Sequence, residues 1–196
     1  MSTTISYENA FSNSITDQQV SSLNSFYKVI RIDGNIKKKE FFSSGNIEQV
    51  LYYMDSLESE VSTVSNLHSE YPTSEISLIY LDVNSVYSVK VEKFFDTESN
   101  YEGKTETILN ANGQEICYVD FDENDNVEEI KKILYLESDT VLYFAYDIDN
   151  GDLISMSGNV SPFVAESQYI NADQIDFFFP DLLVENPYYV DGTFLP

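Results

Sequence analysis

Apolar and polar residues alternate in several short runs, and turn dipeptides separate these runs. Three hairpins are predicted where an Asp-Gly or Asn-Gly pair lies between two runs, because such pairs tolerate the positive φ angles of tight turns. The predicted turns are Asp33-Gly34, Asn112-Gly113 and Asn150-Gly151. A fourth hairpin is predicted around residues 82–85, between two runs rich in Ile, Leu, Val and Tyr. Together they predict a largely antiparallel sheet built from about four hairpins.

Two other segments carry apolar residues at the spacing of one helical face. The first starts at Asn46 and runs past residue 60, and the second starts at Asn126. For the second, we expect Asp125 or Asn126 to cap the helix and Glu128 to complete a capping box. The predicted fold class is therefore α+β, with a largely antiparallel sheet and two amphipathic helices.

The order hairpin, helix, hairpin occurs twice along the chain. Superimposing Asn46 on Asn126 also aligns the Gly-marked hairpins to within one residue, which suggests a duplicated ββαββ unit with halves 27–96 and 104–158. The whole chain, 1–196, is long enough for a single compact domain. The segment 162–196 is rich in aromatic residues and Pro, and we expect it to pack on the core or to dock on a partner. A short helix is expected to start at Thr16 or Asp17.

The charge of the chain is strongly acidic. It contains 34 Asp and Glu against 10 Lys and Arg, a net charge of −24, and residues 133–196 contain 11 acids and no Lys or Arg. Such a field repels nucleic acid and anionic membranes and favours basic partners. The acidity therefore serves either solubility or a functional charged surface.

The main basic cluster is Lys37–Lys39, which follows the first predicted turn. Alternate side chains of a strand point to opposite faces, so the three lysines cannot form one basic patch. We interpret the segment as an edge strand that lysines protect against unwanted pairing. Direct binding of nucleic acid is not predicted.

The single cysteine, Cys117, excludes an internal disulfide, and its apolar surroundings predict a buried strand position. This favours a reducing compartment. The N-terminal residues have neither the basic start nor the apolar run of a signal peptide, and the chain lacks a long apolar stretch. We therefore expect a cytoplasmic protein with no membrane partner, and its oligomeric state stays open.

The acidic stretch DFDENDNVEE, residues 120–129, partly fits a calcium loop. Asp120, Asp122 and Asn124 occupy the first, third and fifth positions of the EF-hand pattern. The pattern then fails, because Asp125 replaces the required Gly and Lys131 replaces the bidentate Glu. Calcium binding of another kind remains an alternative, and no cofactor is predicted.

No catalytic constellation is recognisable in the sequence. The single histidine, His68, stands at the end of a helix or in a loop without a second histidine or a nucleophile motif nearby, and we interpret it as a surface residue. Phosphate-binding loops and zinc-ligand spacings are absent from the sequence. We expect a protein that is not an enzyme.

These observations favour a non-enzymatic acidic protein that neutralises a basic protein. The partner is either a toxin such as a nuclease, with this chain as its immunity protein, or a nucleic-acid-binding protein inhibited by a nucleic-acid mimic. The alternative is a structural or assembly module whose acidity serves solubility. The candidate partner-binding residues are Asp120, Asp122, Glu123, Asp125, Asp147, Asp149 and Asp152.

Overall fold

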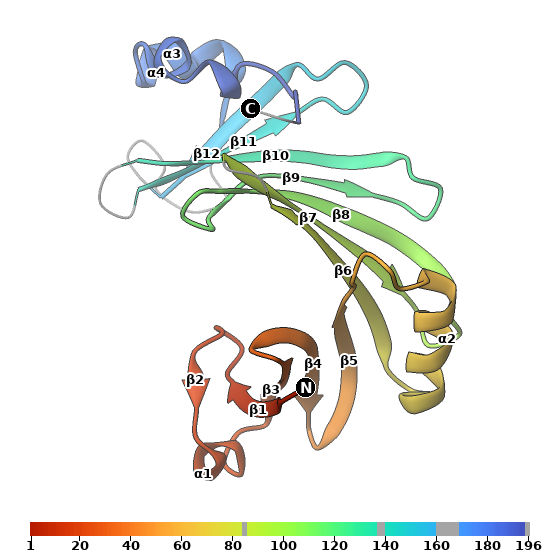
Figure 1. Ribbon diagram of the computed structural model, residues 1–196. Coiled ribbons are helices and arrows are strands. Elements are labelled where there is room, and N and C mark those ends of the chain that lie inside the picture. Colours follow the sequence, from red (N-terminus) through yellow and green to blue (C-terminus); the bar gives the residue numbers. More distant parts are fainter. Residues whose placement is uncertain (84–85, 137–139, 160–168, 195–196) are drawn as a thin grey trace. The chain divides into compact units, whose positions relative to one another are not determined.

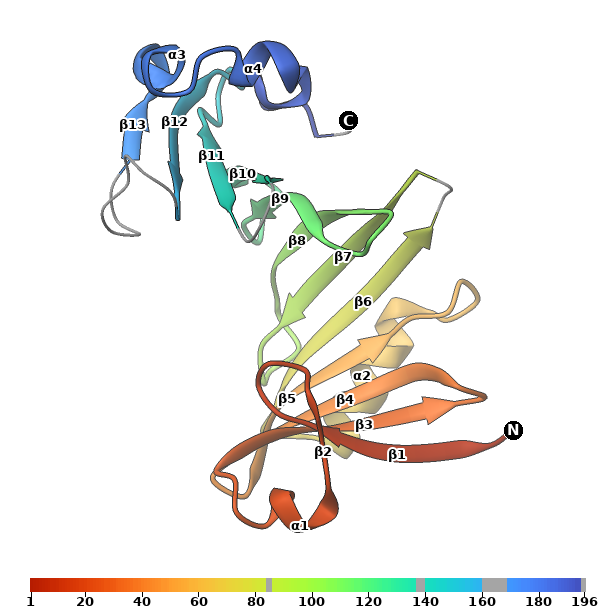
Figure 2. The same cartoon turned by 90° about the vertical axis from the view of Figure 1, so that its left-hand side faces the viewer.

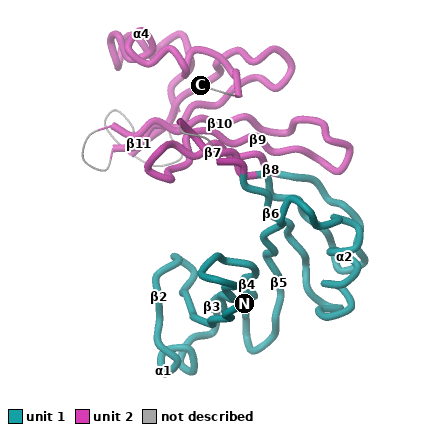
Figure 3. Tube along the Cα trace, viewed as in Figure 1, with its two compact units in different colours: residues 1–81, 91–104 teal, residues 82–90, 105–196 magenta. Residues whose placement is uncertain are grey.

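The computed structural model describes residues 1–83, 86–136, 140–159 and 169–194 (Figure 1). The chain divides into two compact units (Figure 3). Unit 1 comprises residues 1–81 and 91–104, and unit 2 comprises residues 82–90 and 105–196. No helix in the described part of the chain is long and apolar enough to cross a membrane.

The fold is broadly α+β, as predicted, and it is dominated by a mostly antiparallel 13-stranded sheet. Its strand order is β13-β12-β11-β10-β9-β8-β7-β6-β5-β4-β3-β1-β2. The first seven strands are β1 (Thr3–Glu8), β2 (Ser14–Ile15), β3 (Ser25–Ile32), β4 (Asn35–Ser43), β5 (Asn46–Tyr53), β6 (Glu75–Val83) and β7 (Tyr87–Phe95). The others are β8 (Tyr101–Asn110), β9 (Glu115–Phe121), β10 (Val127–Tyr135), β11 (Val141–Tyr146), β12 (Leu153–Gly158) and β13 (Tyr169–Asn171).

The helices are few and short. They are α1 (Asp17–Val20), α2 (Glu60–Glu70), α3 (Ile175–Phe178) and α4 (Leu182–Glu185), with 3-10 turns η1 (Ala172–Gln174) and η2 (Pro187–Tyr189). The expected N-terminal helix is confirmed as α1, which Thr16 caps through a capping box with Gln19.

The three Gly-marked turns lie where the sequence predicts them. Asp33-Gly34 joins β3 to β4 with φ angles of +49° and +89°, the positive values that a two-residue turn of type I′ requires. Gly113 and Gly151 adopt φ angles of +76° and +75° in the turns before β9 and β12. The fourth predicted turn includes residues 84–85, which lie outside the described residues.

Both predicted amphipathic helices are wrong, because the segments starting at Asn46 and Asn126 form strands β5 and β10. Each strand has a neighbour on either side in the sheet, and both of its faces are partly covered. Apolar residues on two faces of a strand can imitate the spacing of one helical stripe. Asp125 does not cap a helix but turns the β9–β10 hairpin with φ +60°, so the capping box with Glu128 is also wrong.

The interpretation of Lys37–Lys39 as an edge strand is wrong as well. Strand β4 pairs with β3 on one side and β5 on the other, so it lies inside the sheet of unit 1. The lysines contact carboxylates instead: Lys37 lies 2.7 Å from Glu58, and Lys39 lies 2.7 Å from Glu8.

Unit 1 is built around a helix that crosses between two parallel strands. Strands β5 and β6 pair in parallel, which requires a long connection, and α2 provides it (Figure 2). The helix begins at Ser59, whose side chain accepts a hydrogen bond from the Ser62 amide. Its apolar face packs on the sheet, and the buried residues of this core are Val50, Val64, Leu67, Tyr71, Ile76, Leu78 and Phe95.

A buried carboxylate ties α2 to β4 in the same unit. Glu40 is 3% exposed and accepts hydrogen bonds from Lys28 at 2.8 Å and from the Tyr71 hydroxyl at 2.5 Å. Lys38 lies 3.2 Å from the same carboxylate. Burial alone would raise the pKa of Glu40, but the bonds from Lys28 and Tyr71 lower it overall.

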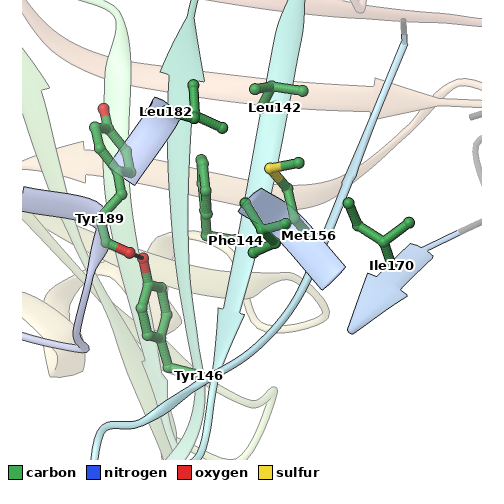
Figure 4. Packing of buried hydrophobic residues seen from close by; sticks show 8 residues of the cluster. Leu142, Phe144, Tyr146, Met156, Ile170, Leu182 and Tyr189 are labelled. Atoms are coloured by element: carbon green, nitrogen blue, oxygen red, sulfur yellow. Dashed lines mark hydrogen bonds between the residues drawn. The ribbon is translucent and has the colours of Figure 1, made fainter. Parts of the chain in front are cut away.

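The C-terminal segment covers the core of unit 2. Figure 4 shows Phe144 and Met156 of the sheet facing Leu182 and Tyr189 of this segment. Two tyrosine hydroxyls fasten the contact: Tyr146 donates to the Tyr189 carbonyl at 2.9 Å, and Tyr189 donates to the Ile133 carbonyl at 3.0 Å. Residues 169–194 of the aromatic tail therefore supply part of the core, while residues 162–168 lie outside the described residues.

We predict that Glu40→Ala lowers the free energy of unfolding by about 3 kcal/mol, because it removes the buried carboxylate that Lys28, Lys38 and the Tyr71 hydroxyl share. Urea unfolding followed by far-UV circular dichroism measures the effect. The control is Glu48→Ala on β5, an exposed position where the change should stay within about 0.5 kcal/mol. Equal effects of the two substitutions would contradict the role of Glu40.

Candidate acidic binding site

Negative charge is concentrated in unit 2. This unit carries 20 Asp and Glu against 3 Lys, whereas unit 1 carries 14 against 7 Lys and Arg. The cations of unit 1 are largely used inside that unit. Ion pairs there join Lys28 to Glu40, Arg31 to Glu8, Lys37 to Asp55 and Glu58, Lys38 to Glu40 and Glu70, Lys39 to Glu8, and Lys93 to Glu60.

The two acidic clusters predicted from the sequence lie at the same end of the sheet of unit 2. Phe121 at the end of β9 pairs with Val127 at the start of β10. Lys131 of β10 pairs with Ala145 near the end of β11, so β11 runs toward the end at which β10 begins. The turn of residues 122–126 and the turn of residues 147–152 therefore project from one end, which we call the acidic end (Figure 1).

At the first turn, two of the predicted binding residues accept hydrogen bonds within the unit. The Asp122 carboxylate accepts hydrogen bonds from the amides of Asn124 and Asn126, both at 2.8 Å, and from the Asn126 side chain at 2.9 Å. The bonds from Asn126 and Asn124 lower the pKa of Asp122. Asp120 accepts a 2.5 Å bond from Thr105 and is half-buried. The side chains of Glu123 and Asp125 are exposed.

The second turn has the same division of roles. The Asp147 carboxylate accepts hydrogen bonds from the amides of Asp149 at 2.9 Å and Asn150 at 3.2 Å. Asp149 and Asp152 are exposed. Asp120, Asp122 and Asp147 therefore shape the acidic end, while the exposed acids of both turns can face a partner.

A further acid, Asp191, joins this end and was missed by the sequence reasoning. It forms an isolated antiparallel bridge with Asp152, and the Gly192 amide donates to the Gly151 carbonyl at 2.7 Å. A Cβ atom on Gly192 would lie 3.2 Å from the Gly151 Cα, so a larger residue would crowd this contact. In the sequence, only the two Gly residues indicate that the two backbone segments lie close together.

A buried lysine anchors the C-terminal segment at the acidic end. Lys132 is 0% exposed, and its Nζ donates to the carbonyl oxygens of Tyr188 and, at 2.7 Å, of Asp191. Nζ also lies 3.7 Å from the centre of the Tyr188 ring, a cation–π contact. Burial lowers the pKa of Lys132 to about 8. The last cation before the cation-free segment is therefore enclosed rather than available to neutralise the surface.

Among the described residues, no three His, Cys, Asp or Glu side chains converge closely enough to hold a metal ion. Asp122 and Asp147, the first residues of the two acidic turns, accept hydrogen bonds from backbone amides.

A separate hollow of about 560 Å³ lies in unit 1 along α2. It is lined by Val61, Val64, His68 and Phe95, together with Glu60 and three serines. His68 lies in α2, so its helical placement is confirmed, and its interpretation as a surface residue holds only in part, because the residue is half-buried. Both of its ring nitrogens are buried and find no hydrogen-bond partner among the described residues.

We predict that the stability of the protein rises with pH relative to that of a Lys132→Met variant. The unfolded chain keeps Lys132 protonated up to a pH near its ordinary pKa, whereas the folded chain releases the proton near pH 8. Between pH of about 7.5 and 9.5, the wild type should therefore gain about 1–2 kcal/mol that the variant does not gain. Urea midpoints across this range measure the difference.

Lys131→Met serves as the control for this experiment. Although desolvation opposes it, the hydrogen bonds of Lys131 with Tyr118 and Glu129 raise its pKa, so it stays protonated in both states across the range. Burial also raises the pKa of Cys117, which acts in the opposite direction above pH 9. Parallel profiles for the wild type and Lys132→Met would contradict a buried, weakly basic lysine.

The chain was compared with protein-family models, curated proteins and solved structures. None of the three comparisons gave a match. The geometry and charge of the acidic end therefore carry the functional argument.

Proposed function

We propose that the chain is a non-enzymatic binding protein that neutralises a basic protein through the acidic end of unit 2. One observation carries the proposal: two turns with exposed carboxylates project from one end of a unit that carries 20 Asp and Glu against 3 Lys, of which Lys132 is buried. The partner is a toxin such as a nuclease with a cationic groove, or a nucleic-acid-binding protein for which the carboxylates replace phosphates. No cofactor takes part in this function.

The physics of such a site favours fast and specific association. Complementary fields raise the association rate, and carboxylates form strong charge-assisted hydrogen bonds with Arg and Lys. Hydrogen bonds from backbone amides to the carboxylates of Asp122 and Asp147 already order both turns, so little entropy is lost when a partner binds. The exposed acids Glu123, Asp149 and Asp152 are the side chains that we assign to the partner.

The same charge opposes direct binding to nucleic acid and to anionic membranes. A cytoplasmic location belongs to the proposal, and the free, buried Cys117 supports it because no disulfide stabilises the fold. In the competing function, a structural or assembly module, acidity serves only solubility. If so, replacing acids at the acidic end and replacing acids elsewhere on the chain would have the same effect on binding.

The test is affinity capture from the cells that produce the protein, with elution by rising salt, followed by measurement of the dissociation constant of the captured basic protein. We expect Glu123→Gln, Asp149→Asn and Asp152→Asn together to weaken binding by about 10- to 100-fold. The triple variant should also show a smaller salt dependence, because it forms fewer ionic contacts.

The matched control is the triple variant Asp17→Asn, Glu48→Gln and Glu75→Gln. These acids are equally exposed, belong to unit 1 and change the net charge by the same amount. The control should bind within about twofold of the wild type. Equal weakening by both variants, or capture of no basic protein at any salt concentration, would contradict the proposal and favour the solubility function.

A further inference from the structure

The C-terminal helices of unit 2 expose large apolar side chains beside carboxylates. On α3, Ile175 is fully buried in the core while Phe177 is 82% exposed. On α4, Leu182 is buried while Val184 is 78% exposed. Phe178, which is 41% exposed, packs edge-on against Phe177 with ring centres 5.0 Å apart. We call Phe177, Phe178 and Val184 the apolar face.

The buried residues of these helices explain why the helices dock, but not why the opposite side is apolar. Ile175 and Leu182 belong to the core cluster that contains Phe144 and Met156. Burial of a Phe or Val side chain stabilises a protein, and the free chain obtains little of this stabilisation from Phe177 or Val184, which are exposed. Exposed apolar groups with a polar rim are typical of protein-binding surfaces.

The charged residues next to the apolar face in the sequence, which we call its rim, are all acidic. Asp176 precedes Phe177, and Glu185 follows Val184, while Asp173 and Asp181 lie at the starts of η1 and α4. All four acids are exposed, and residues 133–196 contain no Lys or Arg that could neutralise them.

The negative charge of the rim determines which kind of molecule can bind the apolar face. A second copy of the chain would place like charges against each other, and an anionic membrane surface would be repelled. A protein surface that presents an aliphatic side chain between Lys or Arg residues satisfies both the apolar face and its rim. Exposed aromatic residues surrounded by polar contacts are frequent binding hot spots.

We propose that the apolar face is the hydrophobic anchor for the basic partner. It binds an aliphatic side chain of the partner that Lys or Arg residues flank. This inference rests on the proposed function, because it assumes a basic partner, and it adds a sequence requirement to that partner. Charge alone would attract any polycation, whereas the anchor distinguishes amphipathic basic segments from purely polar ones.

The test uses two fluorescently labelled synthetic peptides of equal length and equal charge, one of Lys and Leu and one of Lys and Ser. Fluorescence anisotropy gives their affinities for the full chain. We expect the Lys–Leu peptide to bind at least about tenfold more tightly than the Lys–Ser peptide. Phe177→Ser with Val184→Ser should remove this preference and leave the affinity for the Lys–Ser peptide unchanged.

The control variant carries Leu57→Ser and Val61→Ser, which removes two apolar side chains that are 97% and 80% exposed in unit 1. It should keep the preference for the Lys–Leu peptide. Thermal unfolding of both variants should match the wild type, because all four residues are exposed.

Four results would overturn the inference. Equal binding of both peptides to the wild type would leave the proposed function standing and remove the anchor, and binding of neither peptide would contradict both. Equal loss of the preference in the control variant would assign it to general hydrophobicity. Conversion of a wild-type dimer into a monomer by Phe177→Ser with Val184→Ser would show that a second copy occupies the face.

Discussion

The enclosure of Lys132 by the C-terminal segment is the interaction on which the candidate surface of unit 2 depends. An ammonium group without solvent needs compensating partners, and here two backbone carbonyls and a tyrosine ring provide them. These partners come from residues 188 and 191, which follow Lys132 by more than fifty positions in the sequence. The lysine thereby fixes the end of the segment beside the acidic turns, and its own charge is withdrawn from the surface.

The two units differ in how far their charged side chains form ion pairs. In unit 1, lysines meet carboxylates at short distances, as in the group around Glu40, and such pairs support the fold. In unit 2, the exposed acids of the turns have few cations of the same unit to meet. Repulsion among them opposes the compact state. An acidic surface that is kept despite this cost is consistent with a basic partner that relieves it.

The local chemistry of turns could be predicted from the sequence, and the pairing of strands could not. Gly34 and Gly151 adopt positive φ angles that few other residue types adopt, so the pairs Asp33-Gly34 and Asn150-Gly151 identify their hairpins directly. The segments starting at Asn46 and Asn126 were misassigned because strands with neighbours on both sides lose the polar–apolar alternation that separates them from helices. Strand pairing also decides the position of β4 inside the sheet, which the sequence did not reveal. The lysines of β4 find partners on other strands and on α2.

The candidate site was recovered in part for the same reason. The acidic composition of residues 120–125 and 147–152 was visible, but their shared end of the sheet depends on the register of β10 with its neighbours. The division between aspartates that hold the turns and acids that face solvent depends on hydrogen bonds with neighbouring amides. The contributions of Lys132 and Asp191 arise from contacts between residues distant in sequence, which periodicity does not report.

Hydrogen exchange of the full chain, free and bound to the basic protein that it captures, tests the central claim most directly. The account predicts slower exchange on binding at residues 122–126 and 147–152 and in α3 and α4, with unit 1 unchanged. Slower exchange confined to the strands of unit 1 would contradict an acidic binding surface on unit 2.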